Sequence, residues 1–166
     1  MTLSLITGGA GFIGSNLADE LLKMGHKVTV VDNEYSDAHD QFYWNKNTYN
    51  VNCDIRDYKT LKNCMHDVDY VFHFAAEARI QPAIKNPIEA VSINSLGTCT
   101  VLQCAKEAGV KKVMYSSTSA GYGLNPYPNV ETQPDDCLNP YSVSKVNGEK
   151  LCCLLYTSDA ADDSGC

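Results

Sequence analysis

Thr7-Gly8-Gly9-Ala10-Gly11-Phe12-Ile13-Gly14 is the stretch that decides the fold of this chain. The apolar run Leu3 to Ile6 precedes it, and the amphipathic segment Ser15 to Met24 follows it. Apolar residues in a short run indicate a strand, and apolar residues at helical spacing indicate a helix. The sequence therefore predicts a strand, a glycine-rich turn and a helix in direct succession.

The glycines of this turn have separable tasks. Gly8 allows a sharp reversal, because a residue without a Cβ atom can adopt a positive φ. Gly11 leaves room for a pyrophosphate against the backbone, where the free N–H groups of a helix N-terminus favour anions. Gly14 lets the helix lie close to the sheet. A βα turn that merely happens to be rich in glycine is the alternative.

The residues that follow favour the first interpretation. A second strand is predicted over Lys27-Val28-Thr29-Val30-Val31, and it ends in Asp32. In dinucleotide-binding folds an acidic residue about 20 residues beyond the glycine turn binds the adenosine ribose. Strand, turn, helix, strand and acid occur in this order, which predicts a dinucleotide site.

Composition limits the class of protein. The chain has 166 residues, enough for one domain with a substantial core, and its net charge of −7 argues against a nucleic-acid surface. No apolar run reaches membrane-spanning length, and Met1-Thr2 leads straight into the first strand, so we expect no signal peptide and a cytoplasmic protein. The cysteines lack the spacing of a zinc site, and we expect free thiols and no metal at Cys53, Cys64, Cys99, Cys104 and Cys137.

Further strands and helices alternate along the chain. The polar and aromatic segment 33–47 reads as a loop, and its aromatic residues could pack on an adenosine or on the domain itself. Strands are predicted over 49–53, 69–74 and 110–115, a short helix capped by Asp57 runs through Met65, and a long helix spans 88–108. The pattern predicts an α/β fold with a doubly wound parallel sheet, right-handed crossovers and no internal repeat.

Polar groups follow several of these strands, at the edge where ligands bind in open α/β sheets. Ser116-Ser117-Thr118 comes after the strand over 110–115. His73 ends a buried strand, and we give it no catalytic role. Asn94 lies within the long helix among apolar neighbours and needs partners, which could be backbone carbonyls or a cofactor.

A helix that begins at Pro140 carries Tyr141 and Lys145, an i,i+4 pair on one face. By itself such a pair is common on protein surfaces. Beside a nicotinamide it suits alcohol–ketone chemistry: a tyrosine has an ordinary pKa of about 10, and nearby positive charges favour its phenolate. Tyr141 would take the hydroxyl proton as a hydride leaves for the ring, while Thr118 would hydrogen-bond the same oxygen.

These motifs resemble the extended short-chain dehydrogenase/reductases, and within them the NAD-dependent nucleotide-sugar epimerases, in particular UDP-glucose 4-epimerase-like proteins. The resemblance covers roughly residues 3–152. It is carried by the glycine turn, Asp32-Asn33, Asp54-Ile55, 73–76, Asn94 with Gly97-Thr98, Ser116-Ser117-Thr118 and Tyr141 to Lys145. It implies the Rossmann arrangement of the sheet, NAD as cofactor and a nucleotide sugar as substrate, with no nucleic acid and no membrane as partner.

The resemblance also implies roles for individual residues. Catalysis would fall to Tyr141, Lys145 and Thr118. The cofactor would contact the pyrophosphate-binding residues Gly8, Gly11, Phe12, Ile13 and Gly14, the ribose-binding residues Asp32 and Asn33, the adenine-binding residues Asp54 and Ile55, and further along Ala75, Ala76, Asn94, Ser116, Tyr141 and Lys145. Asp32 favours NAD, because a carboxylate repels the 2′-phosphate of NADP.

The reaction that fits best is epimerisation through a transient 4-keto sugar. Dehydratases of this superfamily carry Thr-Asp-Glu after the strand, and decarboxylating relatives keep the Glu, whereas this chain has Thr118-Ser119-Ala120. Without the additional acid and base, oxidation and return of the hydride remain. A dehydratase, a reductase that releases NAD(P)H and a non-catalytic NAD-binding protein are the alternatives.

The resemblance ends near Cys152. Residues 1–152 are expected to form the NAD-binding domain, incomplete because the substrate domain of the relatives is missing. Residues 153–166 resemble a translated sequencing-library adaptor, that is, a non-native tail; a natural disordered tail is the alternative. We expect this fragment to be inactive alone, and the parent protein to be a homodimer through the helices that begin at Pro87 and Pro140.

Overall fold

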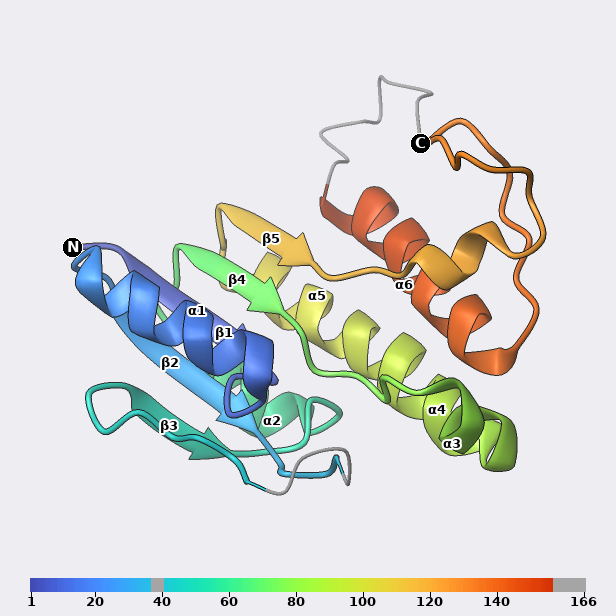
Figure 1. Cartoon of the computed structure of the whole chain (residues 1–166). Coiled ribbons are helices and arrows are strands. Elements are labelled where there is room, and N and C mark those ends of the chain that lie inside the picture. The colour runs from blue at the N-terminus through green and yellow to red at the C-terminus, as the bar shows by residue number, and fades with distance from the viewer. Residues whose placement is uncertain (37–40, 157–166) are drawn as a thin grey trace.

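The glycine turn joins the first strand to the first helix of a parallel sheet, as the computed structural model of residues 1–36 and 41–156 shows (Figure 1). The sheet has five strands in the order β3-β2-β1-β4-β5. Its strands are β1 (Leu3–Thr7), β2 (Lys27–Asp32), β3 (Tyr49–Asn52), β4 (Tyr70–His73) and β5 (Lys112–Tyr115). The predicted doubly wound, Rossmann-like sheet is confirmed.

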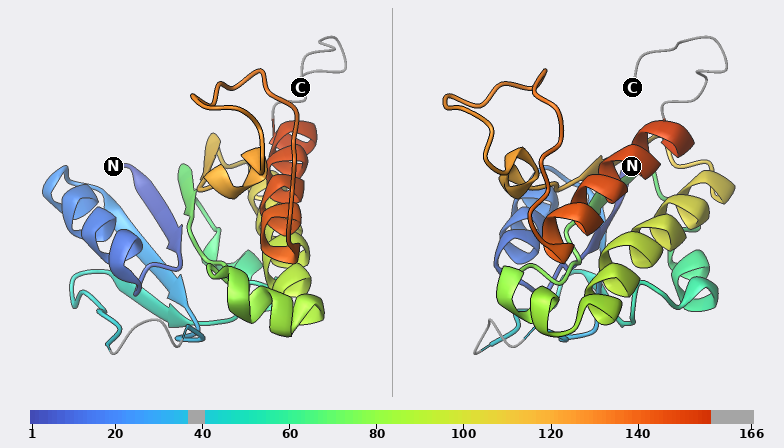
Figure 2. Two further views of the ribbon diagram at one scale, coloured as in Figure 1. Left: turned by 45° about the vertical axis from the view of Figure 1, so that its right-hand side comes forward. Right: turned by 90° about the vertical axis from the view of Figure 1, so that its right-hand side faces the viewer.

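Helices cover both faces of this sheet, with α1 on one face and α5 and α6 on the other (Figure 2). The helices are α1 (Phe12–Lys23), α2 (Tyr58–Cys64), α3 (Ile80–Lys85), α4 (Pro87–Val91), α5 (Thr98–Glu107) and α6 (Pro140–Tyr156). Two shorter elements complete the fold: the π-helical turn η1 (Ser92–Gly97) and the 3-10 turn η2 (Ser119–Tyr122).

Each face of the sheet has its own apolar core. Ile6 and Val30 pack with Ala18 and Leu21 of α1 on one face. On the other face Leu5, Val31 and Val71 join a larger cluster that includes residues of α2 and α5. Neighbouring residues of a strand point to opposite faces, so Leu5 and Ile6 serve the two cores in turn.

The strand order reverses between β1 and β4. Thr7 at the end of β1 lies opposite Val31 of β2 on one side and His73 of β4 on the other. Open α/β sheets bind ligands outside the carboxyl ends of their strands at such a switch point. The topology therefore places a crevice above the end of β1, where the glycine turn begins.

The predicted elements differ from the observed ones mainly in the helices. The helix expected over 88–108 consists of α4, η1 and α5 in direct succession. Helix α6 continues through Tyr156, so the first four residues of the predicted tail are helical, and residues 157–166 lie outside the described part of the chain. Among the described helices, none is both long enough and apolar enough to cross a membrane.

Candidate functional site

The turn after β1 has the backbone that its glycines predict. Gly8 adopts a φ of +67° and donates its N–H to the carbonyl of Val31 at 2.8 Å. A Cβ atom at Gly8 would lie 2.7 Å from the backbone nitrogen of Ala75. Both the positive φ and the close approach of the chain after β4 require glycine here.

The N-terminus of α1 is open. Its N-cap residue is Gly11, which offers no side chain to the first N–H groups of the helix, and Phe12 and Ile13 are 76% and 60% exposed. A Cβ atom at Gly14 would lie 2.6 Å from the Cα atom of Gly9 and closer still to the carbonyl oxygen of Gly8. The close contact of Gly14 is thus with the turn, whereas we expected it with the sheet. The turn thus packs tightly against the first residues of α1, whose N–H groups can bind an anion.

A pocket of about 370 Å³ lies beside this helix end. All residues predicted on the pyrophosphate, the adenosine ribose and the adenine line it, together with two small residues after β4: Gly8, Gly11, Phe12, Ile13, Gly14, Asp32, Asn33, Asp54, Ile55, Ala75 and Ala76. The structure thus gathers these residues, from four separate segments of the chain, around one cavity at the switch point.

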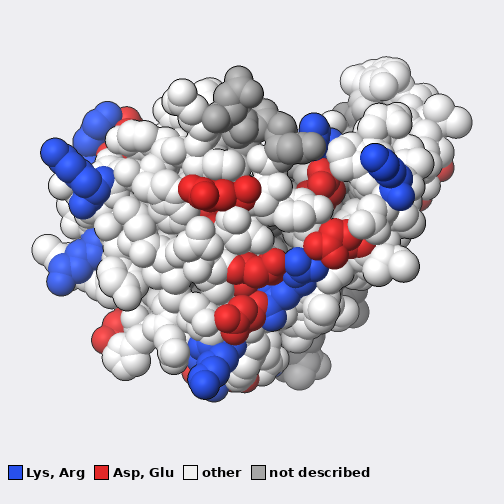
Figure 3. Space-filling model, turned by 90° about the horizontal axis from the view of Figure 1, so that it is seen from below, with Lys and Arg blue, Asp and Glu red and all other residues white. Residues whose placement is uncertain are grey.

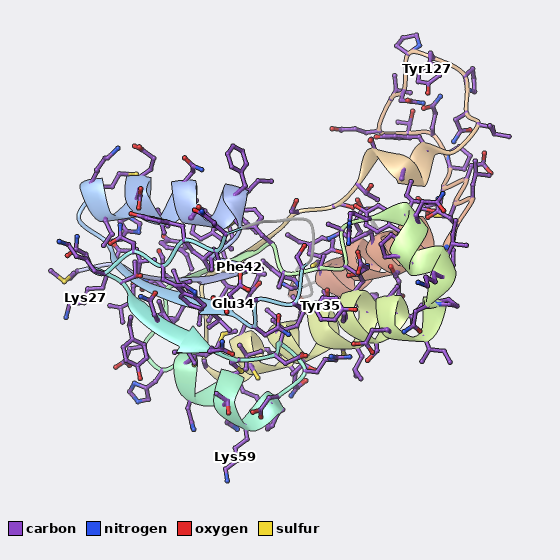
Figure 4. The ribbon with its side chains drawn as sticks, turned by 60° about the horizontal axis from the view of Figure 1, so that its bottom comes forward. Lys27, Glu34, Tyr35, Phe42, Lys59 and Tyr127 are labelled. Atoms are coloured by element: carbon purple, nitrogen blue, oxygen red, sulfur yellow. The ribbon has the colours of Figure 1, made fainter. Side chains whose placement is uncertain are left out.

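Two aromatic side chains of the loop after β2 also line the pocket, namely Tyr35 and Phe42. Figure 4 shows both near Glu34, at the end of β2 opposite to Lys27. Trp44 instead packs against the core beneath α1, and Tyr43 is 52% exposed. The sequence left the place of these aromatics open, because the loop has no periodic pattern.

Five further residues line the pocket without having been predicted there: Ser36, Cys53, Phe74, Ala78 and Ile93. Cys53 and Phe74 adjoin predicted residues, so their neighbours could have indicated them. Ile93 comes from η1, far along the chain, and only the fold brings it to the cavity.

Asp32 is held in place by the backbone. Its side chain ends β2 and accepts the N–H of Ala10 at 3.1 Å and that of Glu34 at 2.8 Å. The residue is only 9% exposed, and it lines the pocket. A carboxylate fixed in this way has lone pairs left for a ribose hydroxyl.

The predicted hydroxyl and tyrosine–lysine residues do not line this pocket. Ser116, Thr118, Tyr141 and Lys145 are absent from the residues that enclose the described cavity. Thr118 accepts the N–H of Ala120 at 3.1 Å and so caps η2. Because its oxygen accepts there, its O–H remains available as a donor.

Lys145 is buried near the end of β5. It is 3% exposed, and its Nζ atom lies 4.3 Å from the ring centroid of Tyr115. Within residues 1–36 and 41–156 this ammonium makes no hydrogen bond or ion pair. Burial lowers the pKa of Lys145 to about 8, because the charged form loses its hydration. An unpaired buried cation is costly, so the site suits a ligand that supplies oxygen partners.

Asn94 is fully enclosed in η1. Its amide bonds the backbone of Glu77 twice, accepting the N–H at 2.8 Å and donating to the carbonyl at 3.0 Å, and it donates to Ser144 of α6 at 2.9 Å. Of the two kinds of partner that the sequence left open, the structure shows backbone groups. Asn94 thereby ties the chain beyond β4 to the helix that carries Tyr141.

His73 is a structural residue here. Its ring is hydrogen bonded to Thr7 at 2.6 Å and to Thr98 at 2.9 Å, with no exposed surface. Burial lowers the pKa of His73 to about 3. A neutral, fully bonded ring is a poor proton acceptor, which agrees with its exclusion from catalysis.

The cysteines predicted as free thiols form no disulfide among the described residues. Cys53, Cys64, Cys99, Cys104 and Cys137 are free thiols, and burial raises the pKa of Cys53 and of Cys104 to about 11. No cluster of metal-ligating side chains occurs in the described part of the chain. On the face seen in Figure 3, acidic side chains lie mainly across the middle, and basic side chains lie at the left edge and beside the acidic ones.

Comparison with known proteins gives one consistent family. The model of the NAD dependent epimerase/dehydratase family matches residues 4–159. The chain is 37% identical over 155 residues to a putative UDP-glucose 4-epimerase of Methanocaldococcus jannaschii, covering 88% of this chain and 48% of that protein. It is 41% identical over 165 residues to a UDP-N-acetyl-alpha-D-glucosaminuronate decarboxylase of Bacillus cytotoxicus, covering 89% and 48%.

Solved structures agree. The UDP-glucose 4-epimerase of Thermotoga maritima with UDP-glucose superimposes with a TM-score of 0.86 at 30% identity, over 95% of this chain and 52% of that one. The Thermus thermophilus UDP-glucose 4-epimerase complex with NAD gives a TM-score of 0.84 at 30% identity, over 95% and 51%. The chain thus spans about half the length of the relatives it matches.

Proposed function

The chain belongs to the NAD-dependent epimerase/dehydratase family, and on this premise we propose that it is the cofactor-binding half of a nucleotide-sugar 4-epimerase. The observation that carries the proposal is the pocket at the switch point, which gathers the glycine turn, the open end of α1 and the Asp32 carboxylate. Because the chain spans about half of its relatives, the activity is proposed for the longer parent protein.

The described residues fit NAD. The turn at Gly8 and Gly14 leaves no room for side chains, so a pyrophosphate can approach the free N–H groups of α1. Asp32 would accept from the adenosine ribose, and its charge disfavours a 2′-phosphate. Asp54 and Ile55 would hold the adenine, with Tyr35 and Phe42 as aromatic walls. When bound, the nicotinamide ring accepts a hydride from the sugar and returns it.

Thr118, which follows β5, and Tyr141 and Lys145 of α6 would handle the proton. Tyr141 is proposed as the base that takes the proton of the sugar 4-hydroxyl, and Thr118 as the donor that hydrogen-bonds the same oxygen as it becomes a 4-keto group. The free O–H of Thr118 supports this role. Lys145, whose ammonium lies over the Tyr115 ring but makes no hydrogen bond or ion pair among the described residues, would bind the nicotinamide ribose and favour the tyrosine phenolate.

The choice of epimerisation rests on what is missing after β5. The segment Thr118-Ser119-Ala120 has no carboxylate to move protons for elimination of water or to serve in decarboxylation. The decarboxylase relative, at 41% identity, makes decarboxylation the second candidate. Both reactions begin with the same oxidation, so the fate of the keto sugar separates them.

The 166-residue chain alone is proposed to have only part of the function of the parent protein. Sugar binding is proposed to need the remainder of the parent protein, so the 166-residue chain should bind NAD without turning over a nucleotide sugar. The parent is proposed to act as a homodimer through α4 to α6. Exposed apolar side chains on that side, Ile88 at 83% and Leu96 at 57%, support such a pairing.

Two measurements test the proposal. Calorimetric titration of this chain with NAD should show one site, and absence of binding would remove the proposed cofactor role. The longer parent protein, produced from the full open reading frame and mixed with UDP-glucose, should convert UDP-glucose to its 4-epimer with no net change in NADH absorbance. Tyr141→Phe should abolish that conversion, and Thr118→Ala should reduce kcat more than KM. Release of carbon dioxide from a UDP-hexuronate would favour decarboxylation instead.

A further inference from the structure

Arg56 does not line the pocket, and its side chain is hydrogen bonded to a residue that does, Asp54. Asp54 and Ile55, which precede Arg56, both belong to the pocket lining. The side chain of Arg56 is 26% exposed, so its charge is partly withdrawn from water. An ion pair in such a position is less screened than a surface pair.

The guanidinium of Arg56 donates hydrogen bonds to both oxygens of the Asp54 carboxylate. Nε of Arg56 donates to Oδ1 at 2.9 Å, and Nη2 donates to Oδ2 at 2.7 Å. The Arg56 backbone N–H adds a bond to Oδ1 at 2.8 Å, and Asn33 donates to Oδ2 at 3.2 Å. This two-pronged geometry fixes the plane of the carboxylate, which a single point charge cannot do.

These four bonds use the lone-pair sites of the carboxylate, of which there are about four. The bond from Asn33 is the longest, and that residue is exposed on the pocket side. An amino group entering the pocket would therefore take the place of the Asn33 amide, while the Arg56 bonds stay. Asp54 can thus accept from a ligand without changing its orientation.

The other end of the guanidinium is anchored to the long helical segment. Nη1 of Arg56 donates to Glu89 of α4 and to Ser92 of η1, both at 3.0 Å. One residue away, Ile55 lies so close to Gly97 of η1 that a Cβ atom there would come within 2.5 Å of its Cδ1. The pocket wall formed by Asp54 and Ile55 is therefore braced from behind by η1.

We propose that Arg56 is a positioning residue for adenine recognition: it holds the Asp54 carboxylate in the orientation that accepts the adenine amino group. Arg56 is itself held in place by its hydrogen bonds to α4 and η1. The inference rests on the proposed binding of NAD in this pocket. It adds a residue that touches no ligand yet sets which purine the pocket prefers. The hydrogen bonds of Arg56 also keep Asp54 ionised, since they hold the pKa of that carboxyl below its usual range.

The test compares NAD with nicotinamide hypoxanthine dinucleotide, in which an oxygen replaces the adenine amino group. The 166-residue chain should bind NAD at least about tenfold more tightly, a preference of about 1.4 kcal/mol, because the carboxylate accepts from an amino group and repels a carbonyl. Arg56→Lys keeps the charge but loses the two-pronged contact. It should reduce this ratio to below about threefold, mainly by weakening NAD.

Two further variants locate the effect. Glu89→Gln leaves Arg56 and Asp54 in place but weakens the anchor on α4, and we expect an intermediate ratio. Glu107→Gln is the matched control. It removes a carboxylate of α5 that pairs with Lys62 of α2 and does not line the pocket, so the ratio of the two affinities should stay unchanged.

The outcomes separate this inference from the proposed function. If the unmodified chain binds neither dinucleotide, the cofactor role itself fails. If it binds both equally, Asp54 does not read the amino group and the inference is overturned. If Arg56→Lys weakens both ligands by the same factor, the residue is merely structural, and the positioning role is again overturned.

Discussion

Gly14→Ala should damage the cofactor pocket with little loss of stability. The new Cβ atom would lie 2.6 Å from the Cα atom of Gly9, and nearer to the carbonyl oxygen of Gly8, whereas real Cβ atoms essentially never come within 3.0 Å of a neighbour. Both neighbours are backbone, so no side chain can rotate away. The turn that lines the pocket must therefore move by at least 0.4 Å, the difference between 3.0 and 2.6 Å.

Two energies oppose each other in this variant. Alanine is favoured over glycine in a helix by about 1 kcal/mol, whereas overpacking of a tight contact costs about 1–3 kcal/mol. The free energy of unfolding should therefore fall by no more than about 2 kcal/mol. The affinity for NAD should fall at least about tenfold, since displacement of the turn loses the equivalent of one good hydrogen bond to a charged group.

Urea unfolding and calorimetric titration with NAD measure the two quantities on the same sample. Gly25→Ala is the matched control, because Gly25 has a φ of +84° with no neighbour within 4 Å of an added Cβ atom. Alanine there costs about 1–2 kcal/mol of backbone strain and should leave NAD affinity unchanged. Wild-type affinity in Gly14→Ala would refute the reasoning, as would equal losses of affinity in both variants.

Three more predictions concern charged or titratable groups. The folded chain keeps His73 neutral because the pKa of His73 is lowered to about 3, whereas the unfolded chain takes up the proton below about pH 6.5. The contribution of His73 to the free energy of unfolding is therefore complete above about pH 6.5 and falls with decreasing pH, by about 2 kcal/mol at pH 5. Urea unfolding at several pH values should show a smaller dependence on pH in His73→Gln. Asp32→Asn should weaken the binding of NAD about tenfold and reduce the preference of the chain for NAD over NADP, as parallel titrations with the two cofactors will show. An unchanged preference would exclude Asp32 as the residue that selects NAD. Lys145→Met should stabilise the ligand-free chain at pH 7 by about 1–3 kcal/mol, because burial lowers the lysine pKa to about 8, yet weaken NAD binding; destabilisation in urea would contradict this.

Local signals allowed the turns and caps to be predicted from the sequence. Asp57 accepts the N–H of Thr60 at 3.2 Å as the N-cap of α2, and Gly8 has its positive φ, because both features depend on a few adjacent residues. Helix α3 was missed. The side chain of its N-cap residue, Arg79, does not cap the helix, and Pro82 lies inside the helix, so no cap or period marks it.

Contacts between distant segments could not be predicted in this way. The partners of Asn94 are the backbone of Glu77 and the hydroxyl of Ser144, which lie 17 and 50 residues away. No pattern in the chain reports such distances. The pocket lining was predictable where it follows a strand end, as at Asp32, and unpredictable where it comes from the middle of a helix, as at Ile93.

The π-helical turn η1 accommodates more residues per turn than an α-helix, and it presents Ser92, Asn94 and Gly97 to different neighbours. Deletion of any one residue there would restore regular winding but rotate the preceding and following segments by about 100° relative to each other. The number of residues in η1 therefore fixes the orientation of α4 relative to α5, so insertions and deletions there should be more harmful than conservative substitutions.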